Sequence, residues 1–274
     1  MAPSVCIAAT LAVAAASIGV GCRRAPDVIG DGPDAFCTAL VDGVGMVDVE
    51  NDYLPHVVAC ENGRAGYQAL PAQAVAARSY LYYRLGHGGS IADGTSDQVY
   101  SCDRQPGLSH RMAVMSTAGQ VLQYRGVQVA AFFVAGGRAS RPDCWGGIDD
   151  PAATERHVTY NMGRSGDDVQ QTTLGTIHTS TLANRGCQSQ NGARCRAAAG
   201  WGYQRILRFY YGDDIELVAA RGPCVAGRGG RRSASGCGDL DAQLALISLL
   251  AAIAVALAAR SARPLRGRSR RRRR

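Results

Sequence analysis

One acidic residue beside a polar helix is the feature of this chain best suited to chemistry. Glu61 ends a short predicted helix, and after a polar, Gly-containing break a long Ala-rich helix carries Gln73, Arg78 and Tyr80. A single carboxyl group can carry one proton, and the neighbouring polar groups can hydrogen-bond to an uncharged polymer. This combination of residues favours the cleavage of a carbohydrate.

The elements that must position these residues predict an α+β fold. An acidic strand leads into the short helix that ends at Glu61. Strands are then predicted where apolar residues alternate or run together, at 113–117, 120–124 and 127–134. Residues 124–126 predict a hairpin turn, residues 182–199 are polar and turn-rich, and residues 202–212 have the apolar spacing of a helix. Because no regular βα alternation and no internal repeat occurs, the strands are expected to cluster after the long helix.

The stretch from Val47 to Leu85 resembles the SpoIID/LytB family, which is named for stage II sporulation protein D. That family has an acidic strand followed by Tyr-Leu, a Glu a few residues later, and a helix that reads Ala-Leu-x-Ala-Gln-Ala-Val-Ala-Ala-Arg-Ser/Thr-Tyr. The matching residues here are Asp48, Glu50, Tyr53, Leu54, Glu61 and the run 69–80. Similar blocks follow at 96–100, 117–122, 131–137, 189–193 and 206–212. The resemblance covers roughly 41–218 and implies a SpoIID-like domain at 41–220, with the Ala-rich helix and the strand-rich region after it around a substrate cleft.

The resemblance implies that Glu61 is the catalytic acid of a peptidoglycan lytic transglycosylase, a lyase that cuts the bond between N-acetylmuramic acid and N-acetylglucosamine. Such an enzyme needs one carboxyl group, because the muramic acid's own 6-hydroxyl replaces the second group of ordinary glycosidases. Glu61 would protonate the glycosidic oxygen and then accept the proton of the 6-hydroxyl as a 1,6-anhydro ring closes. That role requires a partly apolar pocket that raises the pKa of Glu61, and Tyr53, Val57, Val58 and Tyr67 are available to form it.

The resemblance also implies residues that contact the glycan strand, which is the expected partner. These substrate-binding residues are Gln73, Arg78, Tyr80, Gln98, Tyr100, Gly136, Gly137, Ser189 and Gln190. Gln73 could reach acetamido or hydroxyl groups, whereas Arg78 could pair with a lactyl carboxylate or, as we favour, with a buried acid of the fold. The two glycines could let the backbone approach the substrate or could simply form a tight turn. Asp48 and Glu50 alternate along a strand, so both are expected to face solvent.

Two departures from the family pattern bear on activity. The family often shows a Gly-His-Gly-type segment before Ser-Gln-x-Gly-Ala, but residues 184–188 contain no His, and Val134-Ala135 stands where the family often has Ser or Thr before Gly-Gly. One alternative is therefore a non-catalytic peptidoglycan-binding module that enhances a separate cell-wall amidase, and another is an envelope protein that uses only the fold. Some family members hold zinc, but the five His residues here show no ligand spacing with Cys, so neither a metal nor a cofactor is predicted.

The distribution of charge argues against a nucleic-acid partner. The formal net charge is +8, but nine of the 30 basic residues lie in 260–274, and the remainder carries 21 Arg against 22 acids. The part of the chain before residue 260 therefore has no overall basic footprint.

The two ends of the chain predict export and attachment to a membrane or surface. Residues 1–22 are interpreted as a signal peptide because they include a long apolar, uncharged run, although a buried helix of the mature fold would look similar. Residues 221–238 predict a Gly/Ser/Arg-rich linker, 240–259 a transmembrane helix and 260–274 a cytoplasmic Arg-rich tail, which places the domain in the periplasm or on the cell surface. This tail is similar to myxobacterial surface-sorting signals that are cut near a Cys, here Cys237, but a permanent membrane anchor fits equally well.

Ten Cys residues in an exported chain predict disulfides. Cys187 is expected to pair with Cys195, because the two are close in sequence and flank a Gly-containing loop, and Cys102 with Cys144. Cys60 adjoins Glu61, so a bridge at Cys60 would fix the catalytic loop. The spacing leaves other connectivities open.

Overall fold

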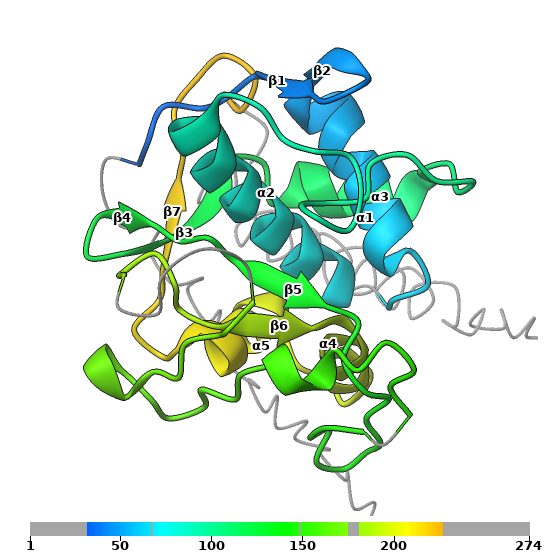
Figure 1. Ribbon diagram of the computed structural model, residues 1–274, viewed down its shortest axis with the longest axis vertical. Coiled ribbons are helices and arrows are strands. Elements are labelled where there is room, and N and C mark those ends of the chain that lie inside the picture. The colour runs from blue at the N-terminus through cyan, green and yellow to red at the C-terminus, as the bar shows by residue number, and fades with distance from the viewer. Residues whose placement is uncertain (1–31, 67, 148, 175–180, 227–274) are drawn as a thin grey trace, which may run out of the picture. The chain divides into compact units, whose positions relative to one another are not determined.

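The computed structural model describes residues 32–66, 68–147, 149–174 and 181–226, which form a mixed α+β fold (Figure 1). Five α-helices and three small sheets occur in this described part of the chain, which confirms the predicted fold class. Several expectations fall outside it, namely the signal peptide at 1–22, the transmembrane helix at 240–259, the tail at 260–274, Cys237, Tyr67 and most of the linker at 221–238. None of the described helices is long and apolar enough to cross a membrane.

The elements follow one another along the chain without a regular alternation of helix and strand. In order they are β1 (Thr38–Val41), β2 (Gly45–Asp48), the π-helix η1 (Val49–Tyr53), α1 (Leu54–Asn62), α2 (Ala69–Gly88), α3 (Leu108–Ser116), β3 (Gln120–Tyr124), β4 (Val127–Gln128), β5 (Phe132–Val134), the 3₁₀ helices η2 (Glu155–His157) and η3 (Gly166–Asp168), β6 (Cys187–Ser189), α4 (Gln190–Ala198), α5 (Tyr203–Tyr211) and β7 (Glu216–Ala219). The β1–β2 and β4–β3–β7 sheets are antiparallel, and β5 pairs with β6 in parallel.

The chain reaches Glu61 through the β1–β2 hairpin, the π-helical turn η1 and the short helix α1. The Asp48 side chain caps η1, because its Oδ1 accepts the Asn51 N–H at 2.8 Å. Pro55 lies in the first turn of α1, where a missing N–H costs no hydrogen bond. Glu61 falls in the last turn of α1, as the sequence predicts.

The Ala-rich helix α2 lies between α1 and the β3 strand (Figure 1), and most of its buried residues belong to two hydrophobic cores. One face packs with β1, η1 and α1, and another packs with β3 and α5. The first face is formed by Leu70, Ala74, Ala77 and Leu81, and the second by Ala69, Ala72, Val75 and Ala76. Every side chain from Ala69 to Tyr82 is buried, and the small Ala residues let neighbouring elements approach on both sides.

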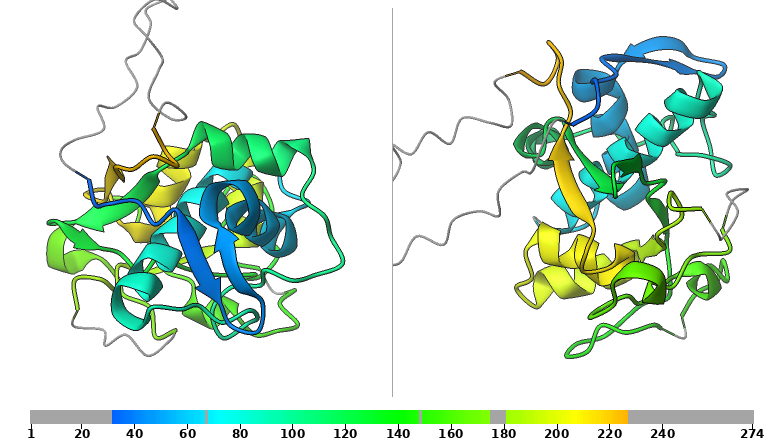
Figure 2. Two further views of the ribbon diagram at one scale, coloured as in Figure 1. Left: turned by 90° about the horizontal axis from the view of Figure 1, so that it is seen from above. Right: turned by 90° about the vertical axis from the view of Figure 1, so that its left-hand side faces the viewer.

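The antiparallel sheet has β3 at its centre, with β4 on one edge and β7 on the other. Figure 2 shows β7 as the gold arrow in its right-hand view. Arg125 and Gly126 connect β3 to β4, and both have positive φ values, of 50° and 75°. Two left-handed residues suit the twist of a tight hairpin, so the predicted turn at 124–126 is confirmed.

The parallel pair β5–β6 joins two distant parts of the chain. Its register places Val134 opposite Ser189. The Asn191 N–H donates to the Ala135 carbonyl at 3.0 Å, so the start of α4 is fastened to the segment that follows β5. This pairing brings Gly136 and Gly137 close to Ser189 and Gln190, four residues that the sequence assigns to one site.

Three local assignments from the sequence differ from the structure. Residues 113–117, predicted as a strand, belong largely to α3, because His110, Ala113 and Val114 are buried at the i, i+3, i+4 spacing of one helix face. The predicted strand 127–134 is divided into β4 and β5. The polar stretch 182–199 contains β6 and α4, whose N-terminus is capped by a side chain and not set by apolar periodicity, whereas the helix expected at 202–212 is confirmed by α5.

The predicted disulfide pairs are wrong. The structure contains the disulfides Cys37–Cys224, Cys60–Cys102 and Cys144–Cys195. Cys187 lies on β6, is completely buried in the core and is free, whereas Cys195 on α4 faces Cys144 with their Cα atoms 5.6 Å apart. Nearness in sequence therefore did not predict the pairing, because Cys187 is buried in the core while Cys195 is bonded to Cys144.

Candidate active site

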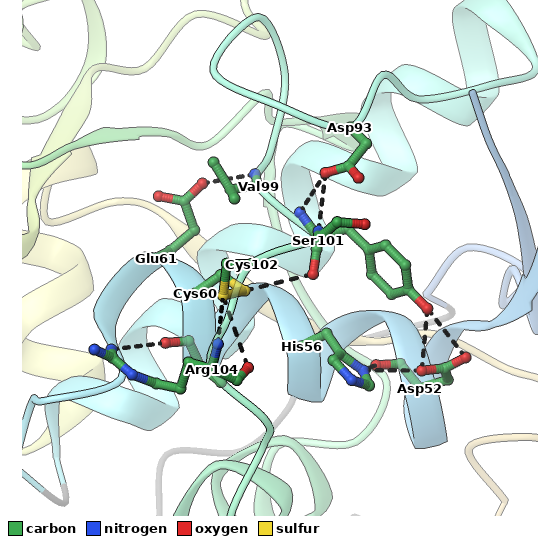
Figure 3. Close-up of a disulfide and its surroundings, with 11 residues drawn as sticks. Asp52, His56, Cys60, Glu61, Asp93, Val99, Ser101, Cys102 and Arg104 are labelled. Carbon is green, nitrogen blue, oxygen red and sulfur yellow. Dashed lines mark hydrogen bonds and ion pairs between the residues drawn. A yellow bond between two sulfur atoms is a disulfide. The ribbon is translucent and has the colours of Figure 1, made fainter. Parts of the chain in front are cut away.

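The carboxyl group of Glu61 is held between two N–H donors that come from distant parts of the chain. The backbone N–H of Val99 donates to Oε1 at 2.8 Å, and Nε2 of Gln190 donates to Oε2 at 3.0 Å. Figure 3 shows the Glu61 side chain turned toward Val99. The sequence-predicted residues Glu61 and Gln190 are thus brought together, while the Val99 donor was missed because a backbone group leaves no signature in residue type.

Burial raises the pKa of Glu61, and the hydrogen bonds from Val99 and Gln190 oppose that rise without cancelling it. The carboxyl is partly buried, so its charged form loses solvation that the two donors restore only in part. A carboxyl group with a raised pKa keeps its proton closer to neutral pH, as a general acid requires.

Gln190 is positioned by the junction between β6 and α4. Ser189 ends β6 and caps α4, because its Oγ accepts the Gly192 N–H at 2.9 Å and donates to the Ala135 carbonyl at 3.4 Å. Gln190 is the first residue of α4, so the cap fixes its backbone beside α1. Ser189 is itself buried and therefore supports the site instead of offering a contact to substrate.

The loop that supplies the Val99 N–H is fastened at several points. The Asp93 carboxylate accepts the N–H groups of Tyr100 and Ser101 at 2.8 and 3.0 Å. The disulfide Cys60–Cys102 ties the same loop to α1, one residue before Glu61 (Figure 3). The bridge expected to fix the catalytic loop is therefore present, with Cys102 as the partner of Cys60.

Three of the predicted substrate-binding residues stabilise this loop. Gln98 is fully buried, accepts the Tyr53 hydroxyl at 2.8 Å and donates to the Ala77 carbonyl at 3.1 Å. The Tyr80 hydroxyl donates to Asp97 at 2.6 Å. Tyr100 stacks on Tyr53 with ring centroids 5.6 Å apart. The two buried residues, Gln98 and Tyr80, have their polar groups bonded within the protein, so their role in this structure is to support the loop.

Arg78 pairs with a buried acid, which is the structural alternative that the sequence left open. Its Nε and an Nη donate to the two carboxylate oxygens of Glu50 at 2.7 and 2.8 Å, and both side chains are buried. The expectation that Glu50 faces solvent is wrong, because the π-helical turn after β2 rotates this residue inward. Gln73 is also completely buried, so neither Arg78 nor Gln73 reaches the surface where a glycan could lie.

Gly136 and Gly137 form a tightly packed turn. The Gly136 N–H donates to Thr154 and the Gly137 N–H to Glu155, at 2.9 and 2.6 Å. A Cβ on Gly137 would stand 2.2 Å from the Gly147 carbonyl oxygen, so only glycine fits there. Since both N–H groups are already used inside the protein, the structure favours the tight-turn interpretation over direct contact with substrate.

A cleft opens from Glu61. A pocket of about 210 Å³ is lined by Glu61, Asn62, Gly63, Arg64, Arg104, Ala135, Gln190, Asn191 and Arg194. A larger pocket of about 720 Å³ shares Arg64, Asn191 and Arg194 with it and extends along α4. Among the described residues that line the two pockets, Glu61 is the only acid. The arrangement therefore offers one proton carrier at the wall of a polar cleft, and the described part of the lining supplies no second carboxyl group.

No group of three or more His, Cys, Asp or Glu side chains in the described ranges is arranged to hold a metal ion. The sequence segment 184–188, where the family often has a His, is buried and structural: Asn184 bonds reciprocally with the backbone of Thr172, and Arg185 pairs with Asp214. None of these five residues lines either pocket. This segment therefore lies outside the described lining of the two pockets.

A family model matches part of the chain. Residues 41–124 match the model of the family described as stage II sporulation protein, SpoIID. The match runs from the last residue of β1 to the end of β3 and includes Glu61 and Val99, whereas Gln190 and the rest of α4 lie beyond it. No curated protein matched the chain.

Proposed function

The chain contains a SpoIID domain at residues 41–124, and from this premise we propose that it is a peptidoglycan lytic transglycosylase in which Glu61 acts as acid and then as base. SpoIID domains act on or bind cell-wall peptidoglycan, and the family includes lytic transglycosylases. The observation that carries the proposal is the single carboxyl group with a raised pKa, held by Val99 and Gln190 at the wall of the cleft. This reaction needs one proton-carrying group, whereas ordinary glycosidases use a pair of carboxyl groups.

Glu61 alone can supply and recover the proton that the proposed reaction needs. Each carboxylate oxygen has a second lone pair, so Glu61 can hold a proton while accepting hydrogen bonds from Val99 and Gln190. That proton passes to the glycosidic oxygen as the bond to C1 of the muramic acid breaks. The 6-hydroxyl oxygen of the same sugar then bonds to C1, and its proton returns to Glu61. No water is consumed, and the product carries a 1,6-anhydro ring.

The roles of the two donors follow from the charge on Glu61. They stabilise the carboxylate that remains after the proton has left, and both are fixed before substrate binds, Val99 by the Cys60–Cys102 loop and Gln190 by the Ser189 cap. Donors that are already oriented need no reorganisation as the charge develops.

The three disulfides and the SpoIID domain indicate an extracellular or cell-wall protein. We propose further that residues 1–22 direct export and that 240–259 hold the domain at the membrane or present Cys237 for surface sorting. Deleting 235–274 should then move the protein from the membrane fraction into the medium or periplasm. Equal solubility of the full chain without detergent would contradict the anchor.

The substitution Glu61→Gln tests the enzymatic role. Gln keeps the shape of the side chain but cannot donate or accept the travelling proton, so cleavage of purified glycan strands should fall by about 10²–10⁴-fold. Glu216→Gln is the matched control, because Glu216 lies on β7 and lines neither pocket. If Glu61→Gln cleaves at the wild-type rate, Glu61 is not the acid. If the wild type binds cell walls but never cleaves them, the protein is the alternative, a peptidoglycan-binding module that enhances an amidase.

A further inference from the structure

The disulfide Cys60–Cys102 differs from the other two disulfides in its exposure to solvent. Cys102 lies in the loop of residues 89–107 that joins α2 to α3, and it is exposed. Cys144, by contrast, is only 1% exposed. The remaining bonded cysteines of the described chain are partly buried, namely Cys37, Cys60, Cys195 and Cys224. A thiol that attacks a disulfide must reach one of its sulfur atoms, so Cys102 offers the most accessible point of attack among these six residues.

The same disulfide stands beside the proposed catalytic group (Figure 3). Cys60 directly precedes Glu61 on α1. Cys102 follows closely after Val99, whose N–H donates to Oε1 of Glu61 at 2.8 Å. The disulfide therefore closes the loop on the helix at the point where the loop supplies its hydrogen bond, whereas the other two disulfides join residues outside α1 and this loop.

The two halves of the loop are held in different ways. Before Val99, the fully buried Gln98 donates to the Ala77 carbonyl on α2 at 3.1 Å. After Val99, the loop is tied to α1 by the disulfide and by Arg104, whose Nη1 donates to the Ala59 carbonyl at 3.1 Å. Arg104 is partly exposed, so water competes for that single hydrogen bond. Breaking the disulfide would consequently loosen the second half of the loop while the first half stays in place.

The surroundings of Cys102 favour its release as a thiolate. The backbone N–H of Arg104 donates to Sγ of Cys102 at 3.4 Å. A hydrogen-bond donor beside a sulfur stabilises the negative charge that the sulfur carries after the S–S bond breaks, and a more stable thiolate leaves faster. Cys102 is therefore both the exposed sulfur of the pair and one whose charge the protein can accommodate.

Exchange with a dithiol then proceeds in two balanced steps. One thiolate of the dithiol bonds to Sγ of Cys102, and the electron pair of the broken S–S bond leaves with Cys60, which takes up a proton. The second thiolate of the dithiol attacks the sulfur of its own partner in this mixed disulfide, and Cys102 leaves and is protonated. The dithiol loses two electrons and two protons and becomes a disulfide, and the protein gains them as two thiols.

We propose that Cys60–Cys102 is a redox-sensitive switch, which a dithiol reductant opens before the other two disulfides and which then releases the Val99 donor from Glu61. The effect on cleavage rests on the proposed function, because it assumes that Glu61 is the acid. Loss of the Val99 bond removes a donor that stabilises the Glu61 carboxylate, so the reduced protein should cleave glycan about tenfold more slowly. Because Gln98 still holds the first half of the loop, the switch lowers the rate of cleavage and does not abolish it.

Labelling of thiols tests the order of reduction without any substrate. The oxidised full-length protein is treated with dithiothreitol under native conditions for increasing times, and the new thiols are alkylated and located by mass spectrometry of peptides. Cys60 and Cys102 should become labelled at least tenfold faster than the four cysteines of the other disulfides. Reduction of either other disulfide at the same rate or earlier would overturn the inference.

Amide exchange tests the release of the donor, again without cleavage. Once Cys60–Cys102 alone is reduced, the peptide that contains Val99 should exchange its amide hydrogens at least tenfold faster, whereas peptides of α2 should keep their protection. The variant Cys60→Ser/Cys102→Ser should match the reduced protein and should not respond to dithiothreitol. Since the wild type is measured in both states, the result does not depend on how well the variant folds. Unchanged exchange around Val99 after reduction would refute the switch.

Glycan cleavage separates this inference from the proposed function. The rate of the wild type should fall about tenfold on reduction and recover on reoxidation, and the variant should stay at the lower rate under both conditions. If reduction loosens the loop but leaves the rate unchanged, the inference is wrong. If the oxidised protein cleaves no glycan while labelling and exchange behave as expected, the switch stands and the proposed catalytic function fails.

Discussion

Replacing Gln190 by Met should move the basic limb of the pH–rate profile to higher pH. Nε2 of Gln190 donates to Glu61 at 3.0 Å, and this bond favours the charged form and lowers the pKa of Glu61 against the effect of burial. Met has a similar length and suits a helix, but it cannot donate this hydrogen bond.

The size of the shift follows from the energy of the bond. A hydrogen bond to a charged group contributes about 1.5–3 kcal/mol, and about 1.4 kcal/mol is a tenfold change in an equilibrium, so the loss of this bond should raise the pKa of Glu61 enough to be resolved in a pH–rate profile. Glu61 must be protonated to act, so the rate falls as pH rises through its pKa. Removing the donor raises that pKa and carries the fall to higher pH, while kcat on the acidic side drops because the carboxyl is less firmly oriented.

The assay is the initial rate of glycan cleavage between about pH 4 and 9 for wild type, Gln190→Met and the control Gln204→Met. Gln204 is a partly buried residue of α5 that lines neither pocket, so its substitution should leave the profile in place. A basic limb that stays fixed or moves to lower pH in Gln190→Met would refute the assigned contact between Gln190 and Glu61.

Three further outcomes are expected. Burial raises the pKa of Glu61 in the folded state, so its negative charge opposes folding once the pH rises through that pKa. In scanning calorimetry Glu61→Gln should therefore unfold at a higher temperature than wild type at pH 8 and show no such gain at pH 3. Equal unfolding temperatures of the two proteins at pH 8 would contradict this reasoning. Replacing Cys60 and Cys102 by Ser should free the Val99 loop and lower kcat about tenfold or more. Replacing Cys37 and Cys224, which close a loop of 187 residues, should instead lower the free energy of unfolding by about 5 kcal/mol in denaturant titration and leave kcat of the folded protein unchanged. Arg78→Met leaves the buried Glu50 unpaired and should destabilise the fold by about 3–5 kcal/mol. The added substitution Glu50→Gln should restore part of this stability. If Arg78→Met alone is as stable as wild type, the ion pair does not stabilise the fold.

The sequence predicted the parts of the site that rest on local pattern. α1, α2 and the hairpin between β3 and β4 follow from helix periodicity and turn residues, and the position of Glu61 follows from the motif that contains it. Gln190 was also identified from its motif. Its hydrogen bond to Glu61, from which it is 129 residues away, depends on the parallel pairing of β5 with β6, which the sequence did not predict.

The remaining features depend on tertiary contacts that residue types do not encode. The Val99 donor is a backbone group, and the disulfides join side chains whose direction is set by separate elements. Glu50 alternates with Asp48 as in an exposed strand, but the π-helical turn buries it against Arg78. Gln73 and Arg78 belong to the most informative motif of the chain, yet they serve the core, because a helix that is packed on several sides buries its polar residues as well.

The central claim is tested most directly by the mass of the products released from purified glycan strands. The wild-type protein should release fragments that end in 1,6-anhydro-muramic acid, about 18 Da lighter than the products of hydrolysis because no water is consumed. Fragments of the hydrolytic mass, with ordinary reducing ends, would contradict the single-residue mechanism assigned to Glu61.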